Sequence, residues 1–223
     1  WPPPNLGIIA QSTNWILRPS RSGFHVAPPI SLRITTMAIK IITPPTAEPV
    51  TLAEAKAQCR VTGTDEDSLI SSLIAAARAM VETELRRPVP DQTIELTIDA
   101  FPTLEIDLQT AGVSSIVSVK YITGGVETTL NSSVYGLDNA DPYESWLIPT
   151  RGNAWPATDD ISNAVKVRFV AGYGPAVPIG IKQWMLLHIS AMYDNRSAIN
   201  EREMKPLSFL DSLIAAERVW KAI

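Results

Sequence analysis

Two early stretches of the chain place their apolar residues at the spacing of an α-helix. Thr51 is followed three residues later by Glu54, a capping box in which each side chain accepts a backbone N–H of the first turn. This pair predicts a helix over about residues 51–60. Thr64 then precedes three acidic residues that complement a helix dipole, which predicts a second helix ending before Pro88. Its expected apolar face carries Leu69, Ile70, Leu73, Ile74, Ala77, Met80, Val81 and Leu85.

The period changes to two between residues 92 and 170, where QTIELTID and AVKVRFV alternate apolar and polar positions. Gly124-Gly125 predicts a tight hairpin into the segment VETTL. Clean alternation is typical of an antiparallel sheet with one solvated face. The dry face is expected to carry Ile94, Leu96, Ile98, Val117, Val119, Tyr121, Val165, Val167 and Phe169, filled out by Phe101, Tyr135, Tyr143, Trp146 and Trp155.

The helical period returns after Pro178, in IGIKQWMLLHISAMYDN. This segment is apolar on nearly every side, which is typical of a helix covered by more than one neighbour, and another subunit is one candidate neighbour. A last helix is expected from Ser208, with an apolar stripe from Phe209 to Ile223. The order of elements predicts an α+β fold, a helical bundle built from both chain ends with an inserted antiparallel β-rich lobe.

These patterns divide the chain into a helical core of residues 37–88 and 178–223 and a β-rich insertion of residues 89–177. Residues 1–36 are rich in proline and carry positive but no negative charge, so they should have no core of their own. Two interpretations of this segment stay open. It is either an arm that orders on a partner or a non-native extension ahead of a start at Met37.

The charge and the cysteine content exclude some classes of function and of site. The net charge is −4, and all 23 acidic residues lie from Glu48 onward, so the body of the chain disfavours binding to phosphate backbones. Cys59 is the single cysteine, which excludes an internal disulfide or a multi-cysteine zinc site, and it is expected to be a buried thiol. The sequence contains no run of 18 apolar residues, so we predict no membrane span. The amino terminus lacks the pattern of a signal peptide.

The search for catalytic chemistry gives no candidate. His188 lies among apolar residues, where a structural, hydrogen-bonded role is expected, and AGYGPAVPIG matches neither nucleotide-binding glycine pattern. The loop aspartates Asp138, Asp141, Asp159 and Asp160 match no calcium loop and are expected to cap turns. We therefore predict no enzyme activity, no cofactor and no metal site. An apolar helix, an apolar C-terminal stripe and a basic arm are features of a protein that assembles.

Three segments in order resemble the head–tail connector (adaptor, or head-completion) proteins of long-tailed bacteriophages, in their longer subgroup with a β-rich insertion. The first is EPVTLAEAKAQCRVTGTDEDSLISSLIAAARAMVETEL. The second is VRFVAGYG at residues 167–174, with Trp155-Pro156 before it, and the third is VPIGIKQWMLLHISAMYDNRSA. The resemblance covers about residues 41–223. Phage-derived gene transfer agents contain similar adaptors, so a free virus is not implied.

The resemblance implies a homo-oligomeric ring of twelve copies in the neck of a virion or phage-like particle, assembled in the bacterial cytoplasm. The ring would bind the portal protein on one side and a stopper or tail-joining protein on the other. It would extend the channel for double-stranded DNA without sequence-specific binding. The expected ring interface is Arg78, Glu82, Arg86, Trp184 and Tyr193, and the expected portal-docking residues are Phe209, Leu213, Trp220, Ile223, Arg18 and Arg21.

Three alternatives remain open from the sequence. Another neck or tail-completion ring protein would share the ring but not the portal contact. A ligand-binding β-module would use the aromatic residues Tyr143, Trp146 and Trp155, although aromatics on a sheet more often belong to a core. An unassigned soluble α+β protein would stay a monomer at high concentration.

Overall fold

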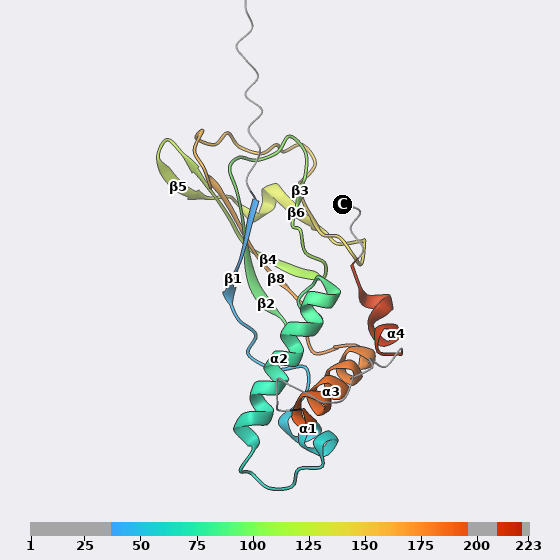
Figure 1. Cartoon of the computed structure of the whole chain (residues 1–223). Coiled ribbons are helices and arrows are strands. Elements are labelled where there is room, and N and C mark those ends of the chain that lie inside the picture. The colour runs from blue at the N-terminus through green and yellow to red at the C-terminus, as the bar shows by residue number, and fades with distance from the viewer. Residues whose placement is uncertain (1–36, 196–208, 220–223) are drawn as a thin grey trace, which may run out of the picture. The chain divides into compact units, whose positions relative to one another are not determined.

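The computed structural model describes residues 37–195 and 209–219 (Figure 1). Within them the elements follow the order strand, helices, strands, helices, which agrees with the predicted α+β fold class. The helices gather at one end of this region and the sheets at the other. In chain order the elements are β1 (Met37–Thr43), α1 (Leu52–Cys59), α2 (Asp67–Leu85), β2 (Gln92–Ile98), β3 (Ile106–Asp107), β4 (Val113–Thr123), β5 (Val126–Thr129), η1 (Ser132–Val134), β6 (Tyr135–Asp138), β7 (Trp146–Pro149), β8 (Val165–Ala171), α3 (Ile179–Asp194), α4 (Leu210–Ile214) and η2 (Ala215–Glu217).

Two antiparallel sheets share one hydrophobic core. The larger has the strand order β1-β2-β8-β4-β5 and the smaller the order β3-β7-β6. On β2 and β8 every second residue is buried, with Leu96 opposite Val167 in the ladder, so the alternation predicted for both segments is confirmed. The buried residues of this core are Ile94, Leu96, Ile98, Ile106, Leu108, Val113, Val119, Leu147, Val165, Val167, Phe169 and Ala171.

Strand β4 departs from simple alternation because its register against β8 shifts twice. One shift falls between Ile116 and Ser118, and Val117, which lies between them, is 56% exposed instead of lying on the dry face. The hairpin into β5 forms as predicted. Gly124 and Gly125 both have positive φ, 58° and 75°, which a two-residue hairpin turn requires.

The solvated face of the larger sheet carries paired charges. The Glu127 carboxylate accepts hydrogen bonds from Lys166 at 2.8 Å and Lys120 at 2.9 Å. These two bonds lower the pKa of Glu127 from its usual 4.5 to about 2. Next to them Arg168 pairs with Glu95 across β8 and β2. The charges on this face are therefore paired. The face is solvated, as the sequence pattern predicted for one side of the sheet.

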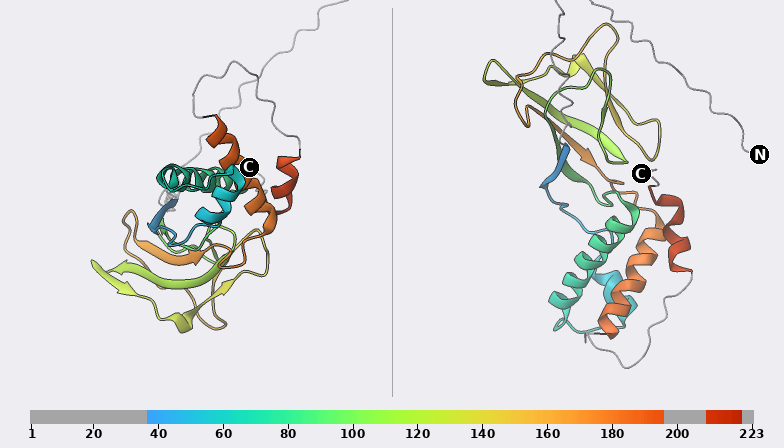
Figure 2. Two further views of the ribbon diagram at one scale, coloured as in Figure 1. Left: turned by 90° about the horizontal axis from the view of Figure 1, so that it is seen from below. Right: turned by 45° about the horizontal axis from the view of Figure 1, so that its top comes forward.

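Strand β1 belongs to the sheet, although the sequence placed it with the helical core. Residues Met37–Thr43 pair antiparallel with β2 and form one edge of the larger sheet (Figures 1 and 2). The predicted helical core of residues 37–88 therefore begins with a strand of the larger sheet. The reason is local, because MAIKII is rich in β-branched isoleucine, which favours a strand, and the following prolines keep it out of the first helix.

Helix α1 begins at the predicted capping box. The Glu54 N–H donates to Thr51 Oγ1 at 3.2 Å, and the Thr51 N–H donates to Glu54 Oε2 at 2.7 Å. Helix α2 begins later than predicted, with Glu66 as the N-cap residue and no side-chain cap bond. Thr64 instead accepts the Asp67 N–H through its backbone carbonyl at 3.1 Å, so its predicted role as the N-cap is wrong.

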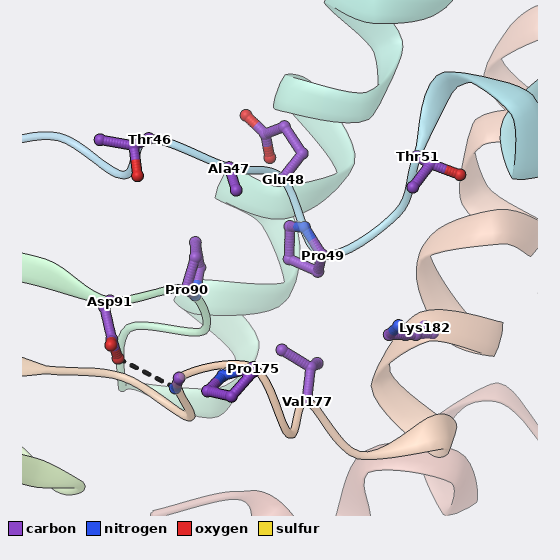
Figure 3. A pocket seen from close by; sticks show the side chains of 11 residues that line it. Thr46, Ala47, Glu48, Pro49, Thr51, Pro90, Asp91, Pro175, Val177 and Lys182 are labelled. Carbon is purple, nitrogen blue, oxygen red and sulfur yellow. Dashed lines mark hydrogen bonds between the residues drawn. The ribbon is translucent and has the colours of Figure 1, made fainter.

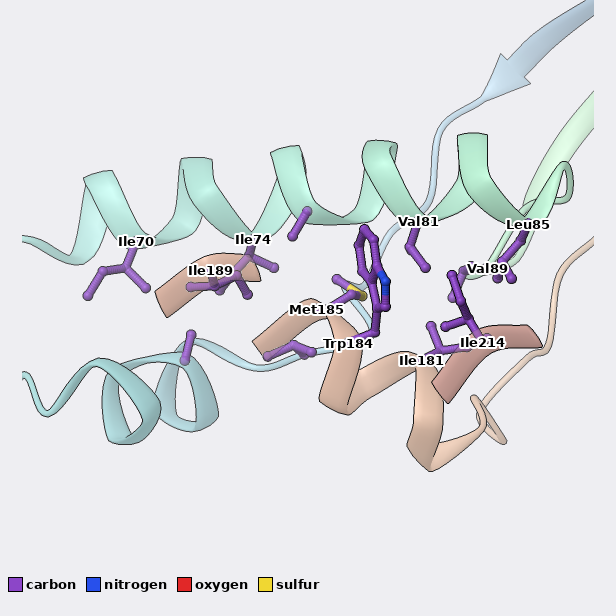
Figure 4. Packing of buried hydrophobic residues seen from close by; sticks show 13 residues of the cluster. Ile70, Ile74, Val81, Leu85, Val89, Ile181, Trp184, Met185, Ile189 and Ile214 are labelled. Atoms are coloured by element: carbon purple, nitrogen blue, oxygen red, sulfur yellow. The ribbon is translucent and has the colours of Figure 1, made fainter. Parts of the chain in front are cut away.

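The helices form a second hydrophobic core around α3 (Figure 4). Helix α3 contacts α1, α2 and α4 of its own chain, which bury Ile181, Trp184, Met185 and Ile189, whereas Ile179 is 71% exposed. Of the expected face of α2, Met80 is 42% exposed. None of the described helices combines the length and the apolar character that a membrane crossing demands. The buried residues of the helical core are Val50, Ala55, Ile70, Ile74, Ala77, Val81, Leu85, Val89, Ile181, Trp184, Met185, Ile189 and Ile214.

The C-terminal helix is shorter than predicted. Helix α4 ends at Ile214, a 3₁₀ turn covers Ala215–Glu217, and Arg218 is extended. The Val219 N–H then donates to the Leu85 carbonyl at the end of α2, at 3.1 Å. Helices α3 and α4 approach so closely that a Cβ on Gly180 would lie 2.3 Å from the Leu213 carbonyl oxygen.

This close approach predicts that Gly180→Ala destabilises the protein. The added methyl group must push α4 away from α3, because the atom it meets is backbone and not a flexible side chain. We expect a loss of about 1–3 kcal/mol in the free energy of unfolding, measured by urea denaturation. Gly63→Ala is the matched control, since nothing lies within 4 Å of a Cβ there, and it should change stability by less than about 0.5 kcal/mol. Equal effects of the two variants would contradict the α3–α4 packing.

Candidate assembly surfaces

The predicted ring residues Arg78 and Glu82 lie together on α2, where they join three parts of the chain. Arg78 Nε donates to Glu48 Oε2 at 2.9 Å and Arg78 Nη1 donates to Glu82 Oε2 at 3.1 Å. The second Glu82 oxygen accepts from the Val89 N–H at 3.1 Å and from Gln92 Nε2 at 2.6 Å. Glu82 thus pairs with Arg78, one helical turn before it on α2. Both charges therefore hold α2 to the segments before α1 and β2.

The other predicted ring residues have three different environments. Arg86 is exposed and takes a left-handed conformation, φ 57°, at the end of α2. Tyr193 is half-buried and donates its hydroxyl to Glu66, which fixes the end of α3 to the start of α2. Trp184 is only 4% exposed and points toward α2 in the helical core (Figure 4). The indole of Trp184 is thus part of the subunit interior and not of a surface, because α2 and α3 of one chain enclose it.

Two of the predicted portal-docking residues lie in the described region. Phe209 is 49% exposed ahead of α4, and Leu213 is half-buried against the helical core. Ile214, which the predicted stripe omitted, is fully buried. The remaining predicted docking residues, Trp220, Ile223, Arg18 and Arg21, lie outside the described residues.

The segment after α4 is held to the junction of sheet and helices by residues that the sequence analysis missed. The Tyr173 hydroxyl donates to Glu217 Oε2 at 2.7 Å, and the Tyr143 hydroxyl donates to the Ala216 carbonyl at 3.2 Å. Burial and the bond to Glu217 raise the pKa of Tyr173, so it remains a donor at any physiological pH. Arg218 adds an ion pair to Glu84 at 2.9 Å. These contacts fix the direction in which the chain leaves α4.

Arg87 packs against the face of the Tyr173 ring at this junction. Its guanidinium carbon lies 4.2 Å from the ring centroid, a cation–π contact, and the residue is 9% exposed. Arg87 Nη1 donates to the Pro142 carbonyl at 3.4 Å. A lone arginine after a helix carries no sequence signal for this role, since its partners come from residues more than 50 positions away.

A cleft opens beside this junction, between the segment before α1, the start of β2 and the start of α3 (Figure 3). It has a volume of about 350 Å³. Asp91 in its wall accepts the Gly174 N–H at 2.9 Å, and Lys182 enters from α3. Three prolines give the walls a rigid backbone. The lining residues include no histidine, cysteine or serine, so the cleft has the chemistry of a contact surface: Thr46, Ala47, Glu48, Pro49, Thr51, Pro90, Asp91, Gly174, Pro175, Val177 and Lys182.

The aromatic residues proposed for a ligand-binding module are used in packing. Trp155 stacks on Phe101 with ring centroids 4.9 Å apart, and its indole N–H donates to the Leu104 carbonyl at 2.6 Å. Trp146 is half-buried in β7, and the Tyr143 hydroxyl holds the C-terminal segment as described above. The Trp155 ring and indole donor and the Tyr143 hydroxyl are therefore used within the chain.

The candidate chemical groups have structural partners. His188 Nδ1 lies 2.9 Å from the Trp184 carbonyl and its ring stacks on that indole, which confirms the predicted structural role. Asp159 accepts the Gly124 and Gly125 N–H groups at 2.9 and 2.7 Å, so it caps the hairpin as expected for a turn residue. Burial raises the pKa of the Cys59 thiol, which makes it a poor nucleophile. Among the described residues no group of three or more potential ligands is placed to hold a metal.

Sequence and structure comparisons give consistent results. Residues 49–123, from the start of α1 through β4, match the family described as "Phage gp6-like head-tail connector protein". A search of curated protein sequences finds no significant match. Among solved structures, a chain of the "Neck of empty GTA particle computed with C6 symmetry" is similar, with 22% identity and a TM-score of 0.69, covering 83% of this chain and 97% of that one.

Two further similar chains come from particles of the same kind. One belongs to the "Virion of native gene transfer agent (GTA) particle", with 21% identity and a TM-score of 0.69. The other belongs to the "Neck of native GTA particle computed with C12 symmetry", with 19% identity and a TM-score of 0.60. Both matches cover 83% of this chain and 97% of the other. At these identities the matches show a common fold. The resemblance to head–tail connector proteins is therefore confirmed, by the family match over residues 49–123 and by a fold shared with chains of gene transfer agent particles.

Proposed function

We propose that this protein is a structural head–tail connector in the neck of a tailed phage or phage-like particle. It would join the portal protein to the stopper or tail-joining protein and extend the channel through which double-stranded DNA passes. The observation that carries the proposal is the family match over α1, α2 and the first half of the β-rich part. The shared fold with chains of gene transfer agent necks supports it.

The proposed assembly is a ring of twelve copies. One similar chain comes from a neck computed with C12 symmetry, which is the symmetry of a twelve-membered ring. A closed ring needs a heterologous interface, in which one patch of a copy meets a different patch of its neighbour. Met80 on α2 and Arg86 directly after it are exposed and are candidates for such a contact, in place of the buried Trp184.

The charge distribution suits a channel wall. All 23 acidic residues lie from Glu48 onward, and they outnumber the basic residues of that region. Tight binding to DNA depends on several lysines and arginines that neutralise phosphates, so an acidic body leaves the passing duplex free to move. An acidic surface of this kind supports a conduit and argues against a sequence-reading protein.

Portal docking is assigned to the start of α4, at Phe209 with Leu213 behind it. Phe209 is 49% exposed, a large apolar side chain at the N-cap of α4, and α4 packs on α3. Aromatic residues that project from a rigid support commonly dominate the energy of an interface. The residues Trp220, Ile223, Arg18 and Arg21 stay predicted contributors to the same contact.

Mixing the protein with the portal protein of the same particle tests the ring. We expect portal-bound assemblies with twelve copies, which add twelve times the chain mass of 24.3 kDa, measured by mass photometry and by electron microscopy without imposed symmetry. An annulus of another copy number would contradict the twelvefold ring. Absence of any annulus next to the portal would contradict the connector function.

Phe209→Ala tests the docking assignment. Removal of an exposed aromatic anchor should weaken portal binding at least about tenfold while the thermal unfolding midpoint changes little. The matched control is Val126→Ala, because Val126 is also a large exposed apolar residue, 63%, but lies on β5 at the far sheet edge. Deletion of residues 209–223 should abolish binding, but it also removes the buried Ile214, so the point variants give the cleaner result. Unchanged affinity of Phe209→Ala in a biosensor assay would refute the assignment.

A further inference from the structure

Strand β1 extends the dry face of the larger sheet beyond the part that the described residues cover. Residues 37, 39 and 41 lie opposite alternate residues of β2 and therefore on the same face. The β2 residues are at most 5% exposed, whereas their β1 partners are 44–54% exposed. Figures 1 and 2 show β1, in blue, at the margin of the sheet. The partner pairs are Met37 with Ile98, Ile39 with Leu96, and Ile41 with Ile94.

The outer edge of β1 is also open to a further strand. Within the described residues only β2 pairs with it, so the backbone N–H and C=O groups of the other side point away from the sheet. Natural proteins usually protect such edges with charges, prolines or bulges. Here the one charge is Lys40 and the irregularity in the ladder comes after Ile41, so the apolar row from Met37 to Ile41 stays accessible.

The sequence directly before β1 has the pattern of a complementary strand. Residues 30–35, ISLRIT, alternate three apolar with three polar positions. An antiparallel pairing with Leu32 opposite Ile39 brings the three apolar residues into line with the exposed row of β1. The same register places the uncharged Ser31 opposite Lys40, so no two positive charges meet.

The chain connection decides which copy receives this strand. Pairing with β1 of the same copy would leave Thr35-Thr36 as a two-residue hairpin turn. Such turns need positive φ and are dominated by Asn and Gly, whereas β-branched threonine is poorly suited to them. If the same two residues stay extended, the strand reaches a different copy, and short strained hinges are known to favour exchange of this kind.

We propose that residues 30–35 of one copy pair with β1 of a second copy as an added antiparallel strand. The inference rests on the proposed ring, in which each copy has an identical neighbour on either side. The exchanged strand covers Met37, Ile39 and Ile41 and closes the free sheet edge. It gives the segment before Met37 a structural purpose in the assembly.

Disulfide trapping between two variants of the full chain tests the exchange. In a Cys59→Ser background, Ser31→Cys and Lys40→Cys are prepared separately, mixed, assembled on the portal and oxidised. Because residues 31 and 40 face each other in the proposed register, we expect a mixed dimer on a non-reducing gel that contains one of each variant. The control mixes Ser31→Cys with Thr129→Cys, which lies exposed on β5 at the opposite sheet edge, and should give no dimer above background.

The same samples separate this inference from the proposed function. Rings seen by electron microscopy without the mixed dimer would overturn the exchange and leave the connector function standing. The chain that carries both cysteines gives a ladder of linked copies if strands are exchanged. If it gives only a compact monomer, the strand pairs within its own copy and the exchange is refuted. A native protein whose intact mass begins at Met37 would also refute it.

A second pair of variants tests the contact without cysteines. Leu32→Asp places a charge in the apolar row, and Ser31→Asp adds the same charge on the other face, opposite Lys40. We expect at least a tenfold lower yield of rings for Leu32→Asp and little change for Ser31→Asp, measured at one protein concentration by mass photometry. Equal yields for the two variants would show that the alternating faces of this segment do not matter and would overturn the proposal.

Discussion

The fold depends on the burial of α3, a helix with apolar residues on nearly every side. Ile181, Met185 and Ile189 are fully buried, which is achieved by helices that come from the other end of the chain as well as by α4. Because α1 and α2 precede strands β2–β8 and α3 follows them, burying α3 draws both ends of this segment to one place. Strands β2–β8 thereby lie in sequence between two halves of one helical core, while β1 joins the larger sheet from before α1, and the energy that fixes the packing of the helices is hydrophobic.

Backbone and side-chain hydrogen bonds join the helical core to the sheets. The Tyr173 N–H donates to the Val89 carbonyl at 2.9 Å, and Asp91 accepts the Gly174 N–H at the same distance. These bonds join the strand that leaves α2 to the segment that enters α3. Since the Tyr173 hydroxyl also holds Glu217, the same residue links the C-terminal segment to both parts. This junction therefore fixes the direction of the C-terminal segment within one chain.

The sequence predicted the elements whose signal is local and missed those set by distant contacts. The Thr51–Glu54 box and the alternation of β2 and β8 needed only neighbouring residues, and both are confirmed. Val117 could not be placed, because its exposure comes from a register shift against β8. The early end of α4 could not be seen either, since Val219 leaves the helix to bond Leu85 of α2. Likewise Tyr173 gave no signal, because its partners are far away in sequence.

The most instructive difference concerns which surfaces are free to assemble. An apolar helix in a sequence suggested a wall shared between subunits, but helices of the same chain bury Ile181, Trp184, Met185 and Ile189 of α3. Apolar groups left exposed include Met37, Ile39 and Ile41 on β1 at the sheet edge and Phe209 ahead of α4. Small separate apolar sites of this kind suit the proposed ring better than one broad apolar surface would. In the proposed assembly, β1 and Phe209 are the apolar groups that identical copies and the portal would cover.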